Sequence, residues 1–281
     1  MKLFRFVSWS LLALGMTGCV SSDTLIKLNP DGSGTVIQKT LMNVEMLAQM
    51  NAMMQGIAKQ TGAFESGKDS TVPELFSESQ IRRMAAKMGE GVTFVSSRKI
   101  KTEQVEGFEA TYAFKDITKL RISQKLGTPG PNEPGTAPDD DGEKTMFRFA
   151  KLPNGHSLLT TIFPQGKADL GKAPSSPPQE SGGQPAPAEI ERMKRLVKGL
   201  RIGMAVEIQG SLVQTNSPYV EGAKVTLLEM DFSELLSNEA KLKEMAALKS
   251  YSLEDAKKIL KDLKGFKINL EPELRIEFAP R

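Results

Sequence analysis

The sequence predicts an α+β fold, in which β-hairpins form an antiparallel sheet and amphipathic helices pack on that sheet. Two observations support this prediction. Segments with alternating polar and apolar side chains come in pairs, and segments with helical spacing of apolar residues stand in separate groups. Short turns and long Pro/Gly-rich loops connect these segments. The regular strand–helix alternation of a doubly wound fold is missing from the pattern.

The first predicted hairpin covers residues 24–41. Its strands flank the turn residues 29–34, Asn-Pro-Asp-Gly-Ser-Gly. These glycines do not form a P-loop, because the Gly-Lys-Ser/Thr ending is missing and the turn joins two strands.

Two amphipathic helices follow the hairpin. The first covers residues 43–60, and the second begins at Ser77, where Gln80 completes a capping box. The first helix is rich in methionine, a flexible side chain that suits both core packing and adaptable apolar binding surfaces. The methionines of this stretch are Met42, just before the helix, and Met46, Met50, Met53 and Met54 within it. The pattern favours core packing and leaves the binding surface as the alternative.

The remaining strands are predicted to pair with their neighbours in the chain. The pairs are 92–102 with 108–115, 144–151 with 156–163, 201–209 with 224–229, and 266–270 with 273–278. Further helices are predicted over residues 187–198, from Asp231 through about Leu248, and over 252–265. In the 201–209 strand, Val206 lies on the apolar face and Glu207 on the polar face.

Two segments lack the apolar residues that would offset the loss of chain entropy on folding. They are residues 127–142 and 165–188, both rich in Pro, Gly, Ser or Asp. We expect both to be flexible.

The first 19 residues form a lipoprotein-type signal. Lys2 and Arg5 precede a short apolar run, and Met16-Thr17-Gly18-Cys19 resembles the lipobox of bacterial lipoproteins. The resemblance implies that residues 1–18 are removed and that acyl chains on Cys19 anchor a mature domain of residues 19–281 in a membrane. Val20 and Ser21 follow the cysteine, where the family carries aspartate in proteins retained at the inner membrane. The resemblance therefore implies an outer-membrane protein, and we expect it to face the periplasm.

A second resemblance concerns the first hairpin. The stretch Thr24–Val36, Thr-Leu-Ile-Lys-Leu-Asn-Pro-Asp-Gly-Ser-Gly-Thr-Val, is similar to the opening of LppM-like bacterial lipoprotein domains. This resemblance implies an α/β domain on a lipid anchor, without an established enzymatic activity and with a suggestion of lipid binding.

Residue types that carry common chemistries are scarce. With Cys19 acylated and His156 as the only histidine, zinc sites and Ser-His or Cys-His nucleophiles have no components. Residues 139–142, Asp-Asp-Asp-Gly, lack the glutamate of an EF-hand at the required spacing. Glu229 and Asp231 are a candidate carboxylate pair, although Asp231 also fits a helix N-cap. We expect no cofactor and no metal.

The net charge argues against nucleic acid as a partner. Lys2 and Arg5 account for two of the 37 basic residues, so the mature chain is nearly neutral against its 34 acidic residues. It also lacks a basic stripe.

Three functions remain. The first is a non-enzymatic envelope protein that binds a protein partner or has a structural role. The second is a carrier or sensor of an apolar ligand such as a lipid. The third, less favoured, is a carboxylate-based hydrolase. An apolar cavity would support the second function, and two facing acids with raised pKa values would support the third.

Overall fold

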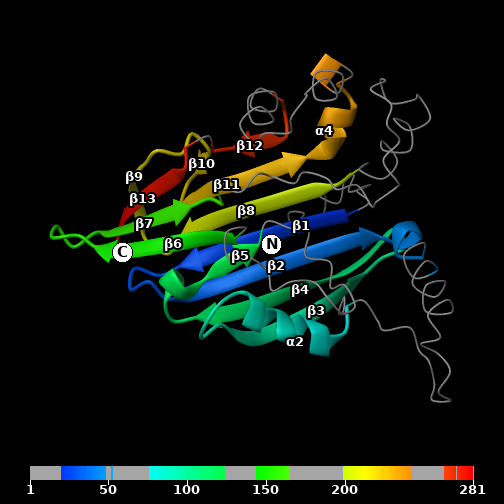
Figure 1. Cartoon of the computed structure of the whole chain (residues 1–281), viewed down its shortest axis with the longest axis horizontal. Coiled ribbons are helices and arrows are strands. Elements are labelled where there is room, and N and C mark those ends of the chain that lie inside the picture. Colours follow the sequence, from blue (N-terminus) through cyan, green and yellow to red (C-terminus); the bar gives the residue numbers. More distant parts are fainter. Residues whose placement is uncertain are drawn as a thin grey trace, which may run out of the picture.

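The computed structural model describes residues 20–48, 52, 76–123, 144–164, 199–238, 240–241, 263–269 and 271–280. In this part of the chain, two β-sheets dominate and the labelled helices are short (Figure 1). The strands are β1 (Val20–Leu28), β2 (Gly34–Asn43), β3 (Thr93–Lys101), β4 (Val105–Phe114), β5 (Arg121–Ser123), β6 (Lys144–Lys151), β7 (Ser157–Ile162), β8 (Arg201–Ile208), β9 (Ser211–Thr215), β10 (Val220–Glu221), β11 (Lys224–Asp231), β12 (Phe266–Ile268) and β13 (Glu273–Ala279). The helices are α2 (Glu78–Lys87), η1 (Ile117–Lys119) and α4 (Phe232–Leu236).

The predicted α+β fold class is wrong for the described residues. A five-stranded small sheet, in the order β5-β6-β7-β13-β9, accompanies an eight-stranded large sheet, in the order β10-β11-β8-β1-β2-β4-β3, with β12 paired to β11. Buried side chains of both sheets belong to one hydrophobic cluster. The fold of the described residues is therefore mostly β. We expected helices to cover the apolar face of the sheet, but packing of one sheet on the other covers much of it.

The large sheet is also not purely antiparallel. β1 lies between β2, its antiparallel hairpin partner, and β8, which runs parallel to it. The apolar side chains of these strands alternate as predicted, and Ile26, Val36 and Val206 are fully buried on one face, which we call the inner face. The parallel pair brings together segments more than 170 residues apart, which a reading based on neighbouring hairpins does not predict.

α2 confirms the predicted helix start and the Ser77 half of the predicted capping box. Ser77 is its N-cap and accepts a hydrogen bond from the backbone N–H of Gln80. Ile81 is buried beneath the helix, and its carbonyl accepts a hydrogen bond of 3.0 Å from the hydroxyl of Tyr112 in β4. The helix is thereby fixed to the large sheet.

Near the C-terminal end, one element prediction is wrong and one strand was not expected. The predicted 266–270/273–278 hairpin does not form, because β12 pairs with β11 in the large sheet whereas β13 pairs with β7 and β9 in the small sheet. β9, which follows β8 directly, was not expected. Of the helix predicted from Asp231 through about Leu248, α4 covers Phe232–Leu236 and residues 240–241 are helical, whereas residues 239 and 242–248 lie outside the described part of the chain.

Several predictions fall on residues that the structure does not describe. They are the signal 1–18 with Cys19, the two Pro/Gly-rich segments 127–142 and 165–188, the 187–198 helix and most of the 252–265 helix. Of the 43–60 helix, the described residues 44–48 and 52 are helical. Among the described residues, no helix is long and apolar enough to cross a membrane.

Candidate functional site on the small sheet

The outer face of the small sheet, which points away from the large sheet, carries a network of charged side chains. β13 has a strict alternation: Leu274, Ile276 and Phe278 are buried, whereas the intervening Glu273, Arg275 and Glu277 lie on the outer face. The apolar half of this pattern fixes β13 in the core. The charged half is thereby held on a rigid strand.

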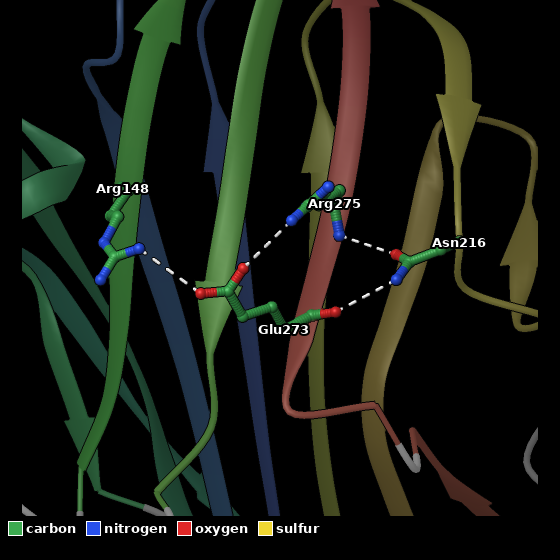
Figure 2. A network of polar contacts seen from close by, with 4 residues as sticks. All are labelled: Arg148, Asn216, Glu273 and Arg275. Atoms are coloured by element: carbon green, nitrogen blue, oxygen red, sulfur yellow. Dashed lines mark hydrogen bonds and ion pairs between the residues drawn. The ribbon is translucent and has the colours of Figure 1, made fainter.

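Four residues from two strands, β6 and β13, and from the turn that follows β9 form this network (Figure 2). The Glu273 carboxylate lies 3.4 Å from the Arg148 guanidinium of β6 and 3.5 Å from that of Arg275. Asn216 Oδ1 accepts a hydrogen bond of 2.7 Å from the Arg275 backbone N–H, and Asn216 Nδ2 donates one of 3.1 Å to the Glu273 carbonyl. Asn216 thus ties the end of β9 to β13, and Glu273 sets the positions of two arginines.

An open hollow of about 640 Å³ lies beside this network. Its walls are formed by the outer face of β13, the end of β9 and the turn before β13. The lining residues are Leu158, Gln214, Thr215, Asn216, Glu271, Pro272, Glu273, Arg275 and Glu277. It is not the apolar cavity that would support a lipid carrier, since most of these side chains are polar.

His156 lies at the far end of the same face. Its Nδ1 lies 2.7 Å from Glu277 Oε1, and Asn154 Nδ2 donates to the same oxygen at 3.3 Å. These contacts hold the pKa of Glu277 below its ordinary value, with the His156 hydrogen bond as the largest cause. Glu277 is therefore a stable anion at neutral pH.

Among the described residues, no carboxyl group shows a clearly raised pKa. The carboxyl groups whose pKa departs clearly from the ordinary value are Asp31, Glu109 and Glu277, and in each the pKa is lowered by hydrogen bonds. A carboxylate-based hydrolase needs one carboxyl with a raised pKa. In the described ranges, no group of three or more His, Cys, Asp or Glu residues lies close enough together to hold a metal ion.

The candidate carboxylate pair has structural partners. Glu229 lies 2.8 Å from Lys267 and 3.5 Å from Arg201. Asp231 caps α4, where its side chain accepts a hydrogen bond of 2.9 Å from the Ser233 backbone N–H. The two carboxylates thus contact different partners and do not act as a pair.

A second polar group lies on the inner face of the large sheet. Gln38 and Thr40 of β2 are 7% and 1% exposed, and Gln38 Oε1 and Thr40 Oγ1 have no hydrogen-bond partner. By register they face Thr24 and Ser22 of β1. Two unsatisfied oxygens within an apolar core are costly, about 1–3 kcal/mol each.

Comparisons with known proteins give little. No protein-family model and no curated protein matches the chain. One solved structure is similar, the NMR structure of the folded domain of the Mycobacterium tuberculosis LppM protein, at a TM-score of 0.32 and 8% identity, over 76% of this chain and 83% of that one. A similarity of this size fixes neither the fold nor the function of the chain.

Proposed function

We propose that this chain is a lipid-anchored protein of the outer membrane, facing the periplasm, and that it acts by binding a protein partner rather than by catalysis. The anchor is the acylated Cys19, and the binding face is the outer face of the small sheet. The observation that carries the proposal is the pre-positioned Arg148–Glu273–Arg275–Asn216 network beside an open hollow.

The network suits recognition of another protein. The side chains of Arg148 and Arg275 are 72% and 66% exposed, yet Glu273 restricts their positions. Arginines are enriched at protein interfaces because their planar guanidinium groups bind carboxylates through two hydrogen bonds. A partner with acidic groups would find both arginines already oriented, which lowers the entropy cost of binding.

The anchor is tested by fatty-acid labelling in the native bacterium. The Cys19→Ser variant should lose the label and leave the membrane fraction, because serine has no thiol to acylate. Equal labelling of the two proteins would contradict the anchor.

The binding face is tested by site-specific photo-crosslinking in cells. By register, Thr160 lies between Arg148 and Arg275 on the outer face. A photoreactive residue at Thr160 should give a discrete adduct that disappears when Arg275→Glu is added. The matched control is Thr111 of β4 in the large sheet. Its side chain lies on the face of the sheet opposite to the face on which its neighbours Ala110 and Tyr112 are buried. Equal adducts at both positions, or none at Thr160, would count against the proposed face.

The unpaired oxygens of Gln38 and Thr40 favour a second candidate function, the binding of an amphiphile. An apolar face with a few hydrogen-bonding groups near its centre is typical of a small-molecule site. A lipid whose hydroxyl or amide group donates to these oxygens would satisfy them.

Apolar substitutions distinguish this second function from a purely structural cost. Gln38→Leu and Thr40→Val remove the oxygens with little change of volume, so we expect equal or greater stability. If the oxygens bind an amphiphile, lipid detected by mass spectrometry in the purified wild type should be lost from the double variant. Lipid content that is the same in both proteins would rule out this role.

A further inference from the structure

The structure indicates which end of the domain faces the bilayer, provided that Cys19 is acylated as in the proposed function. β1 begins at Val20, the residue bonded to Cys19, and its pairing begins there too: Val20 pairs with Met42 of β2, and Ser21 pairs with Arg201 of β8. No linker separates the cysteine from a strand that has a partner on each side. The anchor position therefore sets the orientation of the whole sheet.

We propose that the end of the large sheet at which β1 and β8 begin is a membrane-apposed surface, and that β1 and β8 run from this end away from the bilayer. We call this end the anchor rim. It contains the ends of β2 and β11 and the start of β4, because those strands run antiparallel to their neighbours. Backbone hydrogen bonds connect its segments: the Val44 N–H donates to the Gln104 carbonyl at 3.1 Å, and the Phe232 N–H donates to the Leu200 carbonyl at 2.9 Å.

The small sheet is attached to the opposite end. The Pro30 carbonyl, in the turn between β1 and β2, accepts hydrogen bonds from Ser157 Oγ at 2.9 Å and from Lys151 Nζ. The nine residues of β1 span about 30 Å at the usual rise per residue. The small sheet lies toward that end of β1 (Figure 1), so this orientation places it on the side of the domain away from the bilayer.

The described ion pairs of the anchor rim do not supply an alternative attraction to lipid. Lys101 lies 3.1 Å from Glu106, and Arg201 and Lys267 both contact Glu229. Because basic groups are balanced by acidic ones, electrostatic attraction to anionic headgroups is weak. The orientation follows from the covalent anchor and the short connection, and it should persist at high salt.

Three exposed valines allow a direct test. Val44 is 37% exposed at the anchor rim, whereas Val95 in β3 and Val213 in β9 are 55% and 50% exposed in the far half of the large sheet and in the small sheet. Cys19 is the only cysteine in the sequence, so once it is acylated, a fluorophore attaches only to an introduced thiol. The variants Val44→Cys, Val95→Cys and Val213→Cys are therefore matched in residue type and labelling chemistry.

The lipidated full-length protein is reconstituted into phosphatidylethanolamine/phosphatidylglycerol vesicles that contain a lipid with a nitroxide on its headgroup. We expect the label at Val44 to lose most of its fluorescence and the labels at Val95 and Val213 to keep theirs, at low and at high salt. Quenching at Val95 or Val213 as strong as at Val44 overturns the orientation while leaving the anchor intact. A protein that does not float with the vesicles refutes the anchor itself, and the orientation with it.

Discussion

The strongest test of the fold is the substitution Val206→Asp in β8. Val206 is fully buried on the inner face of the large sheet. It lies opposite Ile26 of β1 on one side and Val225 of β11 on the other, and both of these side chains are fully buried as well. An aspartate here has no cation within the three-residue row that its side chain would enter.

The expected cost follows from two terms. Removing the valine loses about 1.5–3 kcal/mol of apolar burial. Placing a carboxyl group among Ile26 and Val225 without a hydrogen-bond partner costs several kcal/mol more. Since a domain has about 5–15 kcal/mol of stability in total, the variant should be largely unfolded or aggregated.

The measurement is urea unfolding of the mature chain carrying Cys19→Ser, followed by circular dichroism. Glu207→Ala is the matched control, because Glu207 lies on the other face, where it forms a 3.9 Å, partly exposed ion pair with Lys27 and accepts an exposed hydrogen bond of 3.2 Å from Gln209 Nε2. This pair contributes about 0–1 kcal/mol. The destabilisation by Val206→Asp should be smaller near pH 4 than at pH 7. Burial raises the pKa of a carboxyl group, so near pH 4 the buried aspartate is protonated and the cost of burying its charge is absent. Comparable unfolding midpoints for Val206→Asp and Glu207→Ala would refute the register.

Three further predictions concern single polar contacts. Burial raises the pKa of Tyr112, so the free energy of unfolding should fall as pH rises above 10, by about 1.4 kcal/mol per pH unit. The variant Tyr112→Phe should abolish this fall, and it should lose about 0.5–1.5 kcal/mol of stability at neutral pH because the hydrogen bond to the Ile81 carbonyl is missing. Urea unfolding at several pH values measures both effects. The contacts that lower the pKa of Glu277 stabilise the fold above pH 4.5, and this contribution is lost as pH falls through the folded-state pKa. The variant Glu277→Gln should therefore unfold at a lower temperature than wild type at pH 7 and at the same temperature in strong acid. A difference in unfolding temperature that does not depend on pH would contradict this account. Asn216→Ala removes two hydrogen bonds between the end of β9 and β13 and should cost about 1–3 kcal/mol, with faster amide exchange in β9 as the readout and unchanged exchange as the contrary result.

Local structure was predictable from the sequence because its causes are local. The turn residues 29–34 determine the β1–β2 hairpin, and the Ser77 cap determines the start of α2. Alternation placed Val206 on the buried face and Glu207 on the other, as the structure confirms. These features depend on side chains within a few residues of one another.

Pairing between distant strands was not predictable in the same way. Alternation in 273–278 identifies a strand with one apolar face, but it is equally compatible with pairing to residues 266–268 and with pairing to β7, about 115 residues away. In the structure, residues 273–278 pair with β7, and this pairing is part of the small sheet. The predicted fold class failed at this step, because a strand pattern gives the face of a strand but not its neighbour.

The candidate site shows the same division. The Glu273, Arg275 and Glu277 alternation was visible in the sequence as the polar face of a predicted strand. Its partners were not, since Arg148 and Asn216 are 125 and 57 residues distant from Glu273. A charged face becomes a candidate site only when strand order brings these residues together.

The same long-range pairing explains how a domain can be attached without a linker. β1 pairs along its length with β2, and from Ser21 to Leu28 with β8. Ladder hydrogen bonds run across the strands, so a pull on Cys19 along β1 loads both ladders at once instead of opening one bond after another. An edge strand in this position would have a single ladder to resist the pull. The central place of β1, completed by a strand from the second half of the chain, therefore suits a domain whose first mature residue is predicted to be its membrane anchor.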